Sequence, residues 1–112
     1  MTFGESISTC LRKYATFDGR AGRPEYWWFF LFSFLVQMAG GMVSQALAGL
    51  LSLALLLPIL AVGARRLHDI GRSGWWLLVG LIPLIGWLVL LYWFIQRGAE
   101  GVNAYGDAPA AA

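Results

Sequence analysis

Two long stretches of the chain contain no charged side chain, and they determine the architecture that the sequence predicts. The first runs from residue 26 to residue 64. A single α-helix over this run would be about 58 Å long, whereas the hydrocarbon layer of a bilayer is about 30 Å thick. The run must therefore fold back on itself, and its small and polar residues place the turn near 41–46. The sequence predicts two membrane spans, at about 26–43 and 47–64.

The second uncharged stretch, from Trp75 to Gln96, has about the length of one membrane crossing. It predicts a third span at about 75–95. Pro83 and Gly86 are expected to bend this helix, which membrane helices tolerate when neighbours satisfy the freed backbone groups. The predicted fold class is therefore an all-α integral membrane protein with three transmembrane helices in one small domain, residues 1–112.

The polar N-terminal region predicts a further helix that does not span the membrane. Thr2 and Glu5 have the spacing of a helix capping box. Apolar side chains then recur on one helical face, which predicts an amphipathic helix in the membrane interface over about 3–15. Cys10 lies on that face. As the only cysteine it excludes an internal disulfide, and it is expected to be a free thiol, with palmitoylation as the alternative.

The composition supports a membrane protein and excludes a soluble one. Hydrophobic residues make up 59% of the chain and charged residues only 12%, whereas soluble domains carry about 25% charged residues. So little charge cannot cover a surface that faces water. No run of like charges or basic aromatic face suggests nucleic acid as a partner.

The distribution of positive charge predicts the orientation. All but one of the eight Lys and Arg residues precede the first span or lie between the second and third. Positively charged flanks stay in the cytoplasm. With three spans, the N-terminus is expected in the cytoplasm and the tail, residues 96–112, on the periplasmic or external side.

Four blocks of sequence point to a particular family. They are Phe17-Asp-Gly-Arg-Ala-Gly-Arg-Pro-Glu-Tyr-Trp27, Arg65-Arg-Leu-His-Asp-Ile-Gly-Arg-Ser-Gly-Trp-Trp76, Ile82-Pro-Leu-Ile-Gly-Trp87 and Gly101-Val-Asn-Ala-Tyr-Gly-Asp-Ala-Pro109. In these the chain closely resembles the YhaH/YhaI-like bacterial inner-membrane proteins, known as domain of unknown function 805. One departure is a shorter hairpin turn between the first two spans. The resemblance implies a multi-pass architecture in the bacterial inner (plasma) membrane and supplies no activity.

Charged residues on the predicted cytoplasmic side form the main candidate site. In one interpretation its arginines bind an anion or a lipid phosphate. In the other, the charges form an interfacial clamp of ion pairs, with Glu25 facing Arg65 or Arg66. The candidate anion-binding residues are Arg20, Arg23, Arg65, Arg66 and Arg72, and the other candidate members of the clamp are Glu25, His68 and Asp69.

Catalysis and metal binding are not expected. His68 and Asp69 are adjacent on a helix and therefore point about 100° apart, which does not suit chelation of one ion. The chain has no second histidine and one cysteine. We therefore expect no enzyme activity, no catalytic residue, no metal and no cofactor.

Tryptophan pairs flank the predicted spans on the cytoplasmic side. Trp27, Trp28, Trp75 and Trp76 are expected to anchor the helices at the interface, as aromatic belts do, and an aromatic ligand cage is the alternative.

Three classes of function remain open at this point. The first is a non-catalytic accessory or scaffold subunit that associates with itself or with a larger membrane complex. The second is a small oligomeric pore or transporter, although the absence of ionisable residues inside the spans argues against ion-coupled transport. The third is a protein that binds anionic phospholipid.

Overall fold

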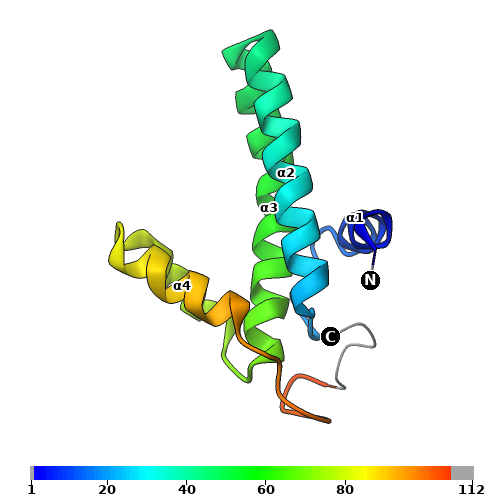
Figure 1. Cartoon of the computed structure of the whole chain (residues 1–112), viewed down its shortest axis with the longest axis vertical. Helices are drawn as coiled ribbons and strands as arrows, with labels where there is room; N and C mark the ends of the chain where they lie inside the picture. Colours follow the sequence, from blue (N-terminus) through cyan, green and yellow to red (C-terminus); the bar gives the residue numbers. More distant parts are fainter. Residues whose placement is uncertain (1, 107–112) are drawn as a thin grey trace.

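The computed structural model describes residues 2–106, and within that range it is helical without any strand (Figure 1). The prediction of an all-α fold is confirmed for these residues. Asp107 and Pro109 of the tail block lie outside the described residues. In chain order the helices are α1 (Phe3–Arg12), α2 (Arg23–Val43), α3 (Gln45–Asp69), the 3₁₀ helix η1 (Gly74–Leu81) and α4 (Ile85–Ile95).

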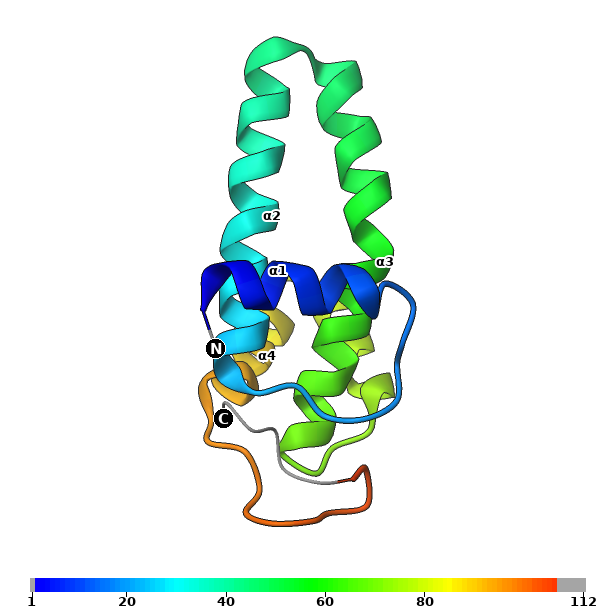
Figure 2. The same cartoon turned by 90° about the vertical axis from the view of Figure 1, so that its right-hand side faces the viewer.

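Helices α2 and α3 form a long antiparallel hairpin (Figures 1 and 2). Ser44 alone separates them, in an extended conformation, and its side chain accepts a hydrogen bond from the Leu47 N–H. The turn thus lies inside the window expected from the sequence. The uncharged parts, 26–43 and 45–64, are about 27 and 30 Å long. Both helices are long and apolar enough to cross a membrane.

Helix α1 crosses the α2–α3 hairpin (Figure 2). The capping box predicted at its start is present, with Thr2 and Glu5 each accepting a backbone hydrogen bond from the other. Ser6 and Cys10 face inward and are buried. The helix ends at Arg12, three residues before the predicted end.

The third apolar stretch differs from the prediction of one helix over 75–95. The chain forms η1, turns at residues 82–84 and returns as α4. The two short helices pack on each other, with the Trp76 and Trp93 rings 5.7 Å apart and the Trp87 indole donating to the Gly80 carbonyl at 3.0 Å. Instead of a bent helix, this stretch is a second hairpin.

The turn of the second hairpin has a local cause. Ile82 is extended, as residues before proline tend to be, and η1 ends there. Leu84 then adopts a positive φ of 65°, and the Ile85 N–H donates to the Pro83 carbonyl at 2.7 Å. This is a γ-turn. Gly86 allows α4 to pack closely against the end of η1, because a Cβ at this position would overlap the Val79 carbonyl oxygen.

We call the end of the α2–α3 hairpin near Asp69 the base and the end near Ser44 the tip. In Figure 1, α1 and the η1–α4 hairpin lie on opposite sides of the α2–α3 hairpin, both toward the base. The described part of the tail, 96–106, also lies at the base. The tail and α1 therefore lie at the same end of the long hairpin. The sequence analysis instead predicted a third membrane span between them, which would have put the tail at the opposite end.

Candidate functional site: a buried arginine–carboxylate cluster

Five charged side chains are buried together at the base, and we call them the base cluster: Arg20, Glu25, Arg65, Arg66 and Asp69. Asp69, the last residue of α3, lies between two guanidinium groups. Arg20 Nε is 3.0 Å from one carboxylate oxygen and Arg66 Nη1 is 3.0 Å from the other. Because all three side chains are almost fully buried, these bonds form away from water, where removal of one partner is costly.

The second half of the base cluster centres on Glu25 near the start of α2. Its carboxylate pairs with Arg65, the first of the two partners that the sequence suggested. Arg65 Nε also donates to the Thr16 carbonyl at 3.1 Å, and Ser6 Oγ donates to the Glu25 carbonyl at 2.6 Å. This half of the cluster joins α1, the linker that follows it, α2 and α3.

Backbone carbonyls supply further acceptors for the arginines, which outnumber the carboxylates in the cluster. Arg20 donates to the carbonyls of Gly101 (2.6 Å) and Gly106 (3.2 Å), and also to that of Ala99. Arg66 Nε donates to the Phe94 carbonyl at 3.1 Å. The guanidinium groups therefore bind the end of α4 and the tail to the base.

His68 makes a second set of contacts with the tail, at Asn103 and Tyr105. Its Nδ1 lies 2.9 Å from the Gly19 carbonyl, and because a carbonyl only accepts, this nitrogen carries the proton. The imidazole stacks on the Tyr105 ring with centroids 4.0 Å apart and planes 1° from parallel. Asn103 Nδ2 donates to the His68 carbonyl at 2.9 Å. His68 thus positions the tail, and with the residues from 2 to 106 it forms no ion pair.

Close packing of the tail against Asp69 depends on Gly98. A Cβ at this position would overlap the Asp69 carboxylate. The next residue, Ala99, donates its N–H to the Asp69 carbonyl at 2.7 Å. Asp69 is therefore bound by α3, by the linker before α2 and by the tail together.

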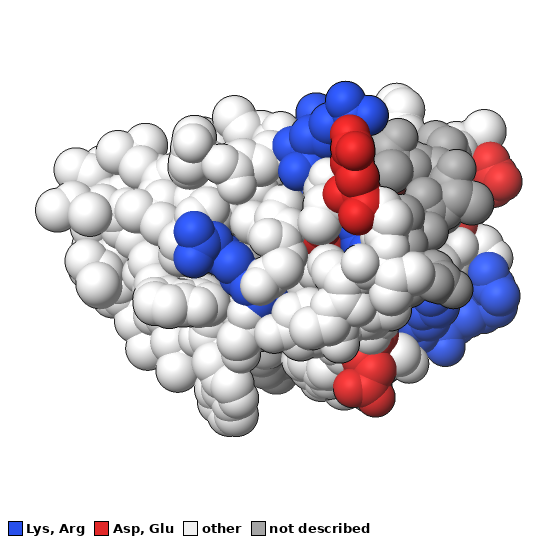
Figure 3. Space-filling view, turned by 90° about the horizontal axis from the view of Figure 1, so that it is seen from below, with Lys and Arg blue, Asp and Glu red and all other residues white. Residues whose placement is uncertain are grey.

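The structure divides the five candidate anion-binding arginines into two groups. Arg20, Arg65 and Arg66 are buried and bound within the chain. Arg23 and Arg72 are exposed. Arg72 lies over the Trp93 ring, 4.4 Å from its centroid, while an Arg23 Nη1 is 3.5 Å from the Ile95 carbonyl. Seen from below, charged atoms form separate patches on the base, and a broad uncharged surface extends to one side (Figure 3).

The four candidate anchor tryptophans have different surroundings. Trp27 is partly buried and its indole N–H donates to the Phe94 carbonyl at 3.1 Å. Trp28, Trp75 and Trp76 are exposed, Trp75 by 79%. Trp27 therefore joins α2 to α4, and the other three lie on the outer surface of the molecule.

Cys10 is a free thiol, as expected, and it is buried beside the base cluster. Burial, together with the nearby Glu25 carboxylate, raises the pKa of the thiol to about 11, and the Arg65 guanidinium only partly opposes this. The thiol is therefore protonated and shielded at neutral pH. Such a thiol is a poor nucleophile, and its burial argues against palmitoylation.

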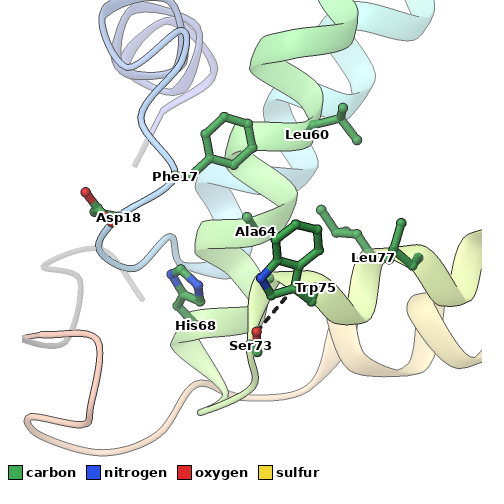
Figure 4. A pocket seen from close by; sticks show the side chains of 10 residues that line it. Phe17, Asp18, Leu60, Ala64, His68, Ser73, Trp75 and Leu77 are labelled. Carbon is green, nitrogen blue, oxygen red and sulfur yellow. Dashed lines mark hydrogen bonds between the residues drawn. The ribbon is translucent and has the colours of Figure 1, made fainter.

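A cavity of about 420 Å³ lies between the linker before α2, α3 and η1 (Figure 4). Phe17, Leu60 and Leu77 form part of an apolar wall, and His68 and Ser73 are among its few polar residues. This lining suits an apolar chain with one polar end. Among residues 2–106, no group of three or more His, Cys, Asp or Glu residues is placed to hold a metal ion.

Several docking residues were not recognised from the sequence. Asn103 and Tyr105 belong to a block rich in glycine with asparagine, which is typical of a tight turn. A turn does form there, with the Tyr105 N–H donating to Asn103 Oδ1 at 2.8 Å. Their contacts with His68 had no signal in the sequence, because the two blocks are far apart in the chain. The contact of Arg72 with Trp93 was also missed.

Comparison with known proteins agrees with the resemblance found in the sequence blocks. A model of the family described as protein of unknown function (DUF805) matches residues 14–107. Inner membrane protein YhaI of Escherichia coli K12 is 45% identical over 106 residues, which cover 88% of this chain and 90% of that protein. Inner membrane protein YhaH of the same organism is 40% identical over 110 residues, covering 88% and 91%.

A more distant relative is the uncharacterized protein YiiR of Escherichia coli K12, 35% identical over 90 residues, covering 74% of this chain and 60% of that protein. No solved structure matches the chain. YhaI and YhaH are named inner membrane proteins, which implies a lipid bilayer environment for this family, and YiiR is named only as uncharacterized. The chain therefore belongs to the DUF805 family of proteins of unknown function, as its arginine–histidine–aspartate block indicated.

Proposed function

We propose that the protein is a non-catalytic scaffold subunit that enters the inner membrane from the cytoplasmic face as two apolar hairpins, with both chain ends in the cytoplasm. The base cluster is the observation that carries this proposal. It binds the linker before α2, the end of α3 and the tail to one another. A tail held by Arg20 lies on the same side of the membrane as Arg20.

The distribution of positive charge supports the same topology. If only the α2–α3 hairpin crosses the bilayer, all eight Lys and Arg residues lie on the base side. Three spans would place Arg97 on the opposite side. Because Lys and Arg flanks are retained in the cytoplasm, the two-hairpin arrangement satisfies the charge rule more completely, and the base faces the cytoplasm.

A structural role for the cluster supports the absence of catalysis. Its carboxylates contact arginines of the same chain, and those arginines also bind carbonyl groups. Most donors and acceptors of the cluster are therefore occupied within the chain, and among its described atoms the buried Arg65 Nη2 has no hydrogen-bond partner. What the fold offers to other molecules is the apolar surface of its hairpins, which suits lipid and the helices of membrane partners, including further copies of this chain.

Reporter fusions test the topology. A fluorescent protein fused after Ala112 should be bright and alkaline phosphatase at the same position inactive, because both would be in the cytoplasm. Phosphatase inserted at Ser44 is the matched control and should be active. Active phosphatase at the C-terminus would restore three spans and contradict the two-hairpin topology.

Binding of anionic phospholipid is a second candidate function, for which we propose the exposed Arg23 and Arg97 in place of the buried arginines. A polar cavity of about 350 Å³ is lined by Arg23, Arg97 and the backbone of residues 98–101. Two exposed guanidinium groups beside a membrane surface can bind a lipid phosphate. Glu100 and Asp69 also line this cavity, and Asp69 is already neutralised by its arginine partners.

Native mass spectrometry of the protein in mild detergent separates the candidate functions. Phosphatidylglycerol or cardiolipin that is retained by the parent, lost in Arg23→Gln and kept in the control Arg12→Gln would support lipid binding. A closed ring of subunits would support the pore. A monomer or a complex with another membrane protein, without retained lipid, supports the scaffold.

A further inference from the structure

We infer that the protein is a wedge that prefers membranes curved convexly toward the cytoplasm. This inference rests on the proposed topology. The base half of the molecule contains α1, η1 and α4 in addition to α2 and α3, whereas near the tip only α2 and α3 remain (Figures 1 and 2). With the base in the cytoplasm, the added helices all lie in one leaflet.

The η1–α4 hairpin is too short to leave that leaflet. Each arm is about 16 Å long, from about 2.0 Å per residue in a 3₁₀ helix and 1.5 Å in an α-helix. The hydrocarbon layer is about 30 Å thick, so one arm reaches no further than about the middle of the bilayer. The hairpin therefore takes up area in the cytoplasmic leaflet and adds none to the other.

The surface of this hairpin requires hydrocarbon around it. A helix that lies on the membrane surface has one charged face, but residues 73–96 include no charged side chain. Large apolar side chains point outward along both arms. The most exposed are Trp75, Leu81, Leu84, Ile85, Trp87, Leu88 and the ring of Tyr92, each between 60% and 79% exposed. Burying these side chains requires insertion among the acyl chains.

Helix α1 adds area to the same leaflet on the other side of α2–α3. Its polar face carries exposed Glu5 and Arg12, and it lies beside the start of α2, where Ser6 contacts the Glu25 carbonyl. Phe3 packs on the Trp28 ring with centroids 5.6 Å apart. This places α1 at the boundary between headgroups and acyl chains, the usual depth of an amphipathic helix.

The wedge is held rigid where it joins the long hairpin. Phe94 is buried, and its ring lies 4.4 Å from that of Tyr26. Its carbonyl accepts from both Trp27 Nε1 and Arg66 Nε at 3.1 Å. These contacts oppose rotation of the η1–α4 hairpin toward the tip of α2–α3. Such a rotation would make the cross-sectional area of the molecule similar in the two leaflets. The difference in area is therefore a fixed property of the fold.

Membrane tubes pulled from giant phosphatidylethanolamine–phosphatidylglycerol vesicles test the inference. The protein carries Ser8→Cys in a Cys10→Ser background and is labelled after reconstitution with an impermeant maleimide dye. Only molecules with α1 on the outer face then fluoresce. Their density relative to lipid should be several-fold higher on the tube than on the vesicle, and should rise as the tube narrows. Equal densities, or depletion from the tube, would overturn the inference.

Two lysine substitutions localise the effect. Leu81→Lys places a charge at the far end of η1, deep in the leaflet, and should move the second hairpin toward the surface and abolish enrichment. Met42→Lys is the matched control, because Met42 is 86% exposed beside the tip, where a lysine reaches water. It should keep the enrichment of the parent. Equal enrichment in both variants would contradict the role of the second hairpin.

A labelling experiment on the same vesicles separates failure of the wedge from failure of the proposed topology. A Ser8→Cys/Ala104→Cys double variant in the Cys10→Ser background carries one reporter on α1 and one on the tail, and mass spectrometry counts how many labels of an external impermeant maleimide each molecule takes. Two labels or none in each molecule mean one shared face, and one label in each means opposite faces. Labelling of both from one face without enrichment on tubes would leave the topology intact and refute the wedge. Labelling of the two from opposite faces would refute the topology, and the wedge with it.

Discussion

The two apolar hairpins are built by different means although both come from uncharged sequence. The α2–α3 hairpin has arms long enough to cross a bilayer and is fastened at its base by buried ion pairs. The η1–α4 hairpin has arms of half that length and is held by backbone fit at Pro83 and Gly86. Total length alone forces the first hairpin to turn, whereas in the second a few local residues decide between a turn and a span.

The comparison shows what a count of apolar residues measures. An uncharged run of about twenty residues is long enough for one crossing, but whether it crosses depends on its capacity to form one helix. A proline in its middle removes an amide donor and favours an extended residue before it. The same run can then fill one leaflet as a hairpin.

The largest expected effect on stability comes from removing a buried ion pair at the base of the first hairpin. Asp69→Asn leaves Arg20 and Arg66 buried without a carboxylate, and loss of one partner of a buried ion pair costs about 3–5 kcal/mol. We expect a large drop in the thermal unfolding temperature of the detergent-solubilised protein and release of the tail to protease. Glu100→Gln, an exposed acid on the tail, is the control and should match the parent. If both variants unfold like the parent, the base cluster does not fasten the fold.

An intermediate effect should come from one methyl group added to the second hairpin, with the same change in the first hairpin as its control. Gly86→Ala places a Cβ against the Val79 carbonyl and must open the second turn. Gly49→Ala meets nothing within 4 Å and should be neutral or stabilising by up to about 1 kcal/mol. The unfolding temperature and the near-ultraviolet circular dichroism of the Trp76–Trp93 pair should be measured for both variants. An unchanged signal in Gly86→Ala would show that the turn does not depend on this contact.

The smallest effect is expected in the apolar part of the first hairpin. Ser52 Oγ donates to Gln37 Oε1 at 2.8 Å, a polar contact between α2 and α3. Such bonds in membrane helices are worth about 0.6 kcal/mol on average. Gln37→Leu should therefore lower the free energy of unfolding only slightly. A double-mutant cycle with Ser52→Ala measures the interaction energy of the two side chains. A loss as large as that of Asp69→Asn would mean that side-chain bonds in the apolar region, and not the base cluster, hold this hairpin.

Much of the fold could be predicted from the sequence because it follows from length and charge. The turn near Ser44, the capping box at Thr2 and the pairing of Glu25 with Arg65 each rest on a local or chemical rule. The break at Pro83 was expected only as a bend. The sequence does not show whether neighbours will satisfy the freed amides of a bent helix or whether the chain will reverse, since this depends on contacts such as that of Trp87 with Gly80.

The candidate site was predicted in part for a similar reason. A surplus of arginine over carboxylate led to the expectation of lipid phosphates as partners. In the structure, peptide carbonyls at Ala99, Gly101 and Phe94 fill much of that role. Every residue, proline included, offers a backbone carbonyl, so the choice of these carbonyls as acceptors leaves no trace in residue types. Only the three-dimensional path of the tail reveals it.

The order of synthesis gives the base cluster a further consequence. A chain emerges from the ribosome N-terminus first, so Arg20 is made before its carbonyl acceptors at Ala99 and Gly101, and Asp69 is made before Ala99, whose N–H donates to it. Before residues 99–101 are made, Arg20 lacks these acceptors and can be hydrated. In the proposed topology it would then act as one of the positive charges that keep their flank in the cytoplasm. Docking of the tail removes Arg20 from water, so a residue that would guide insertion becomes part of the interior.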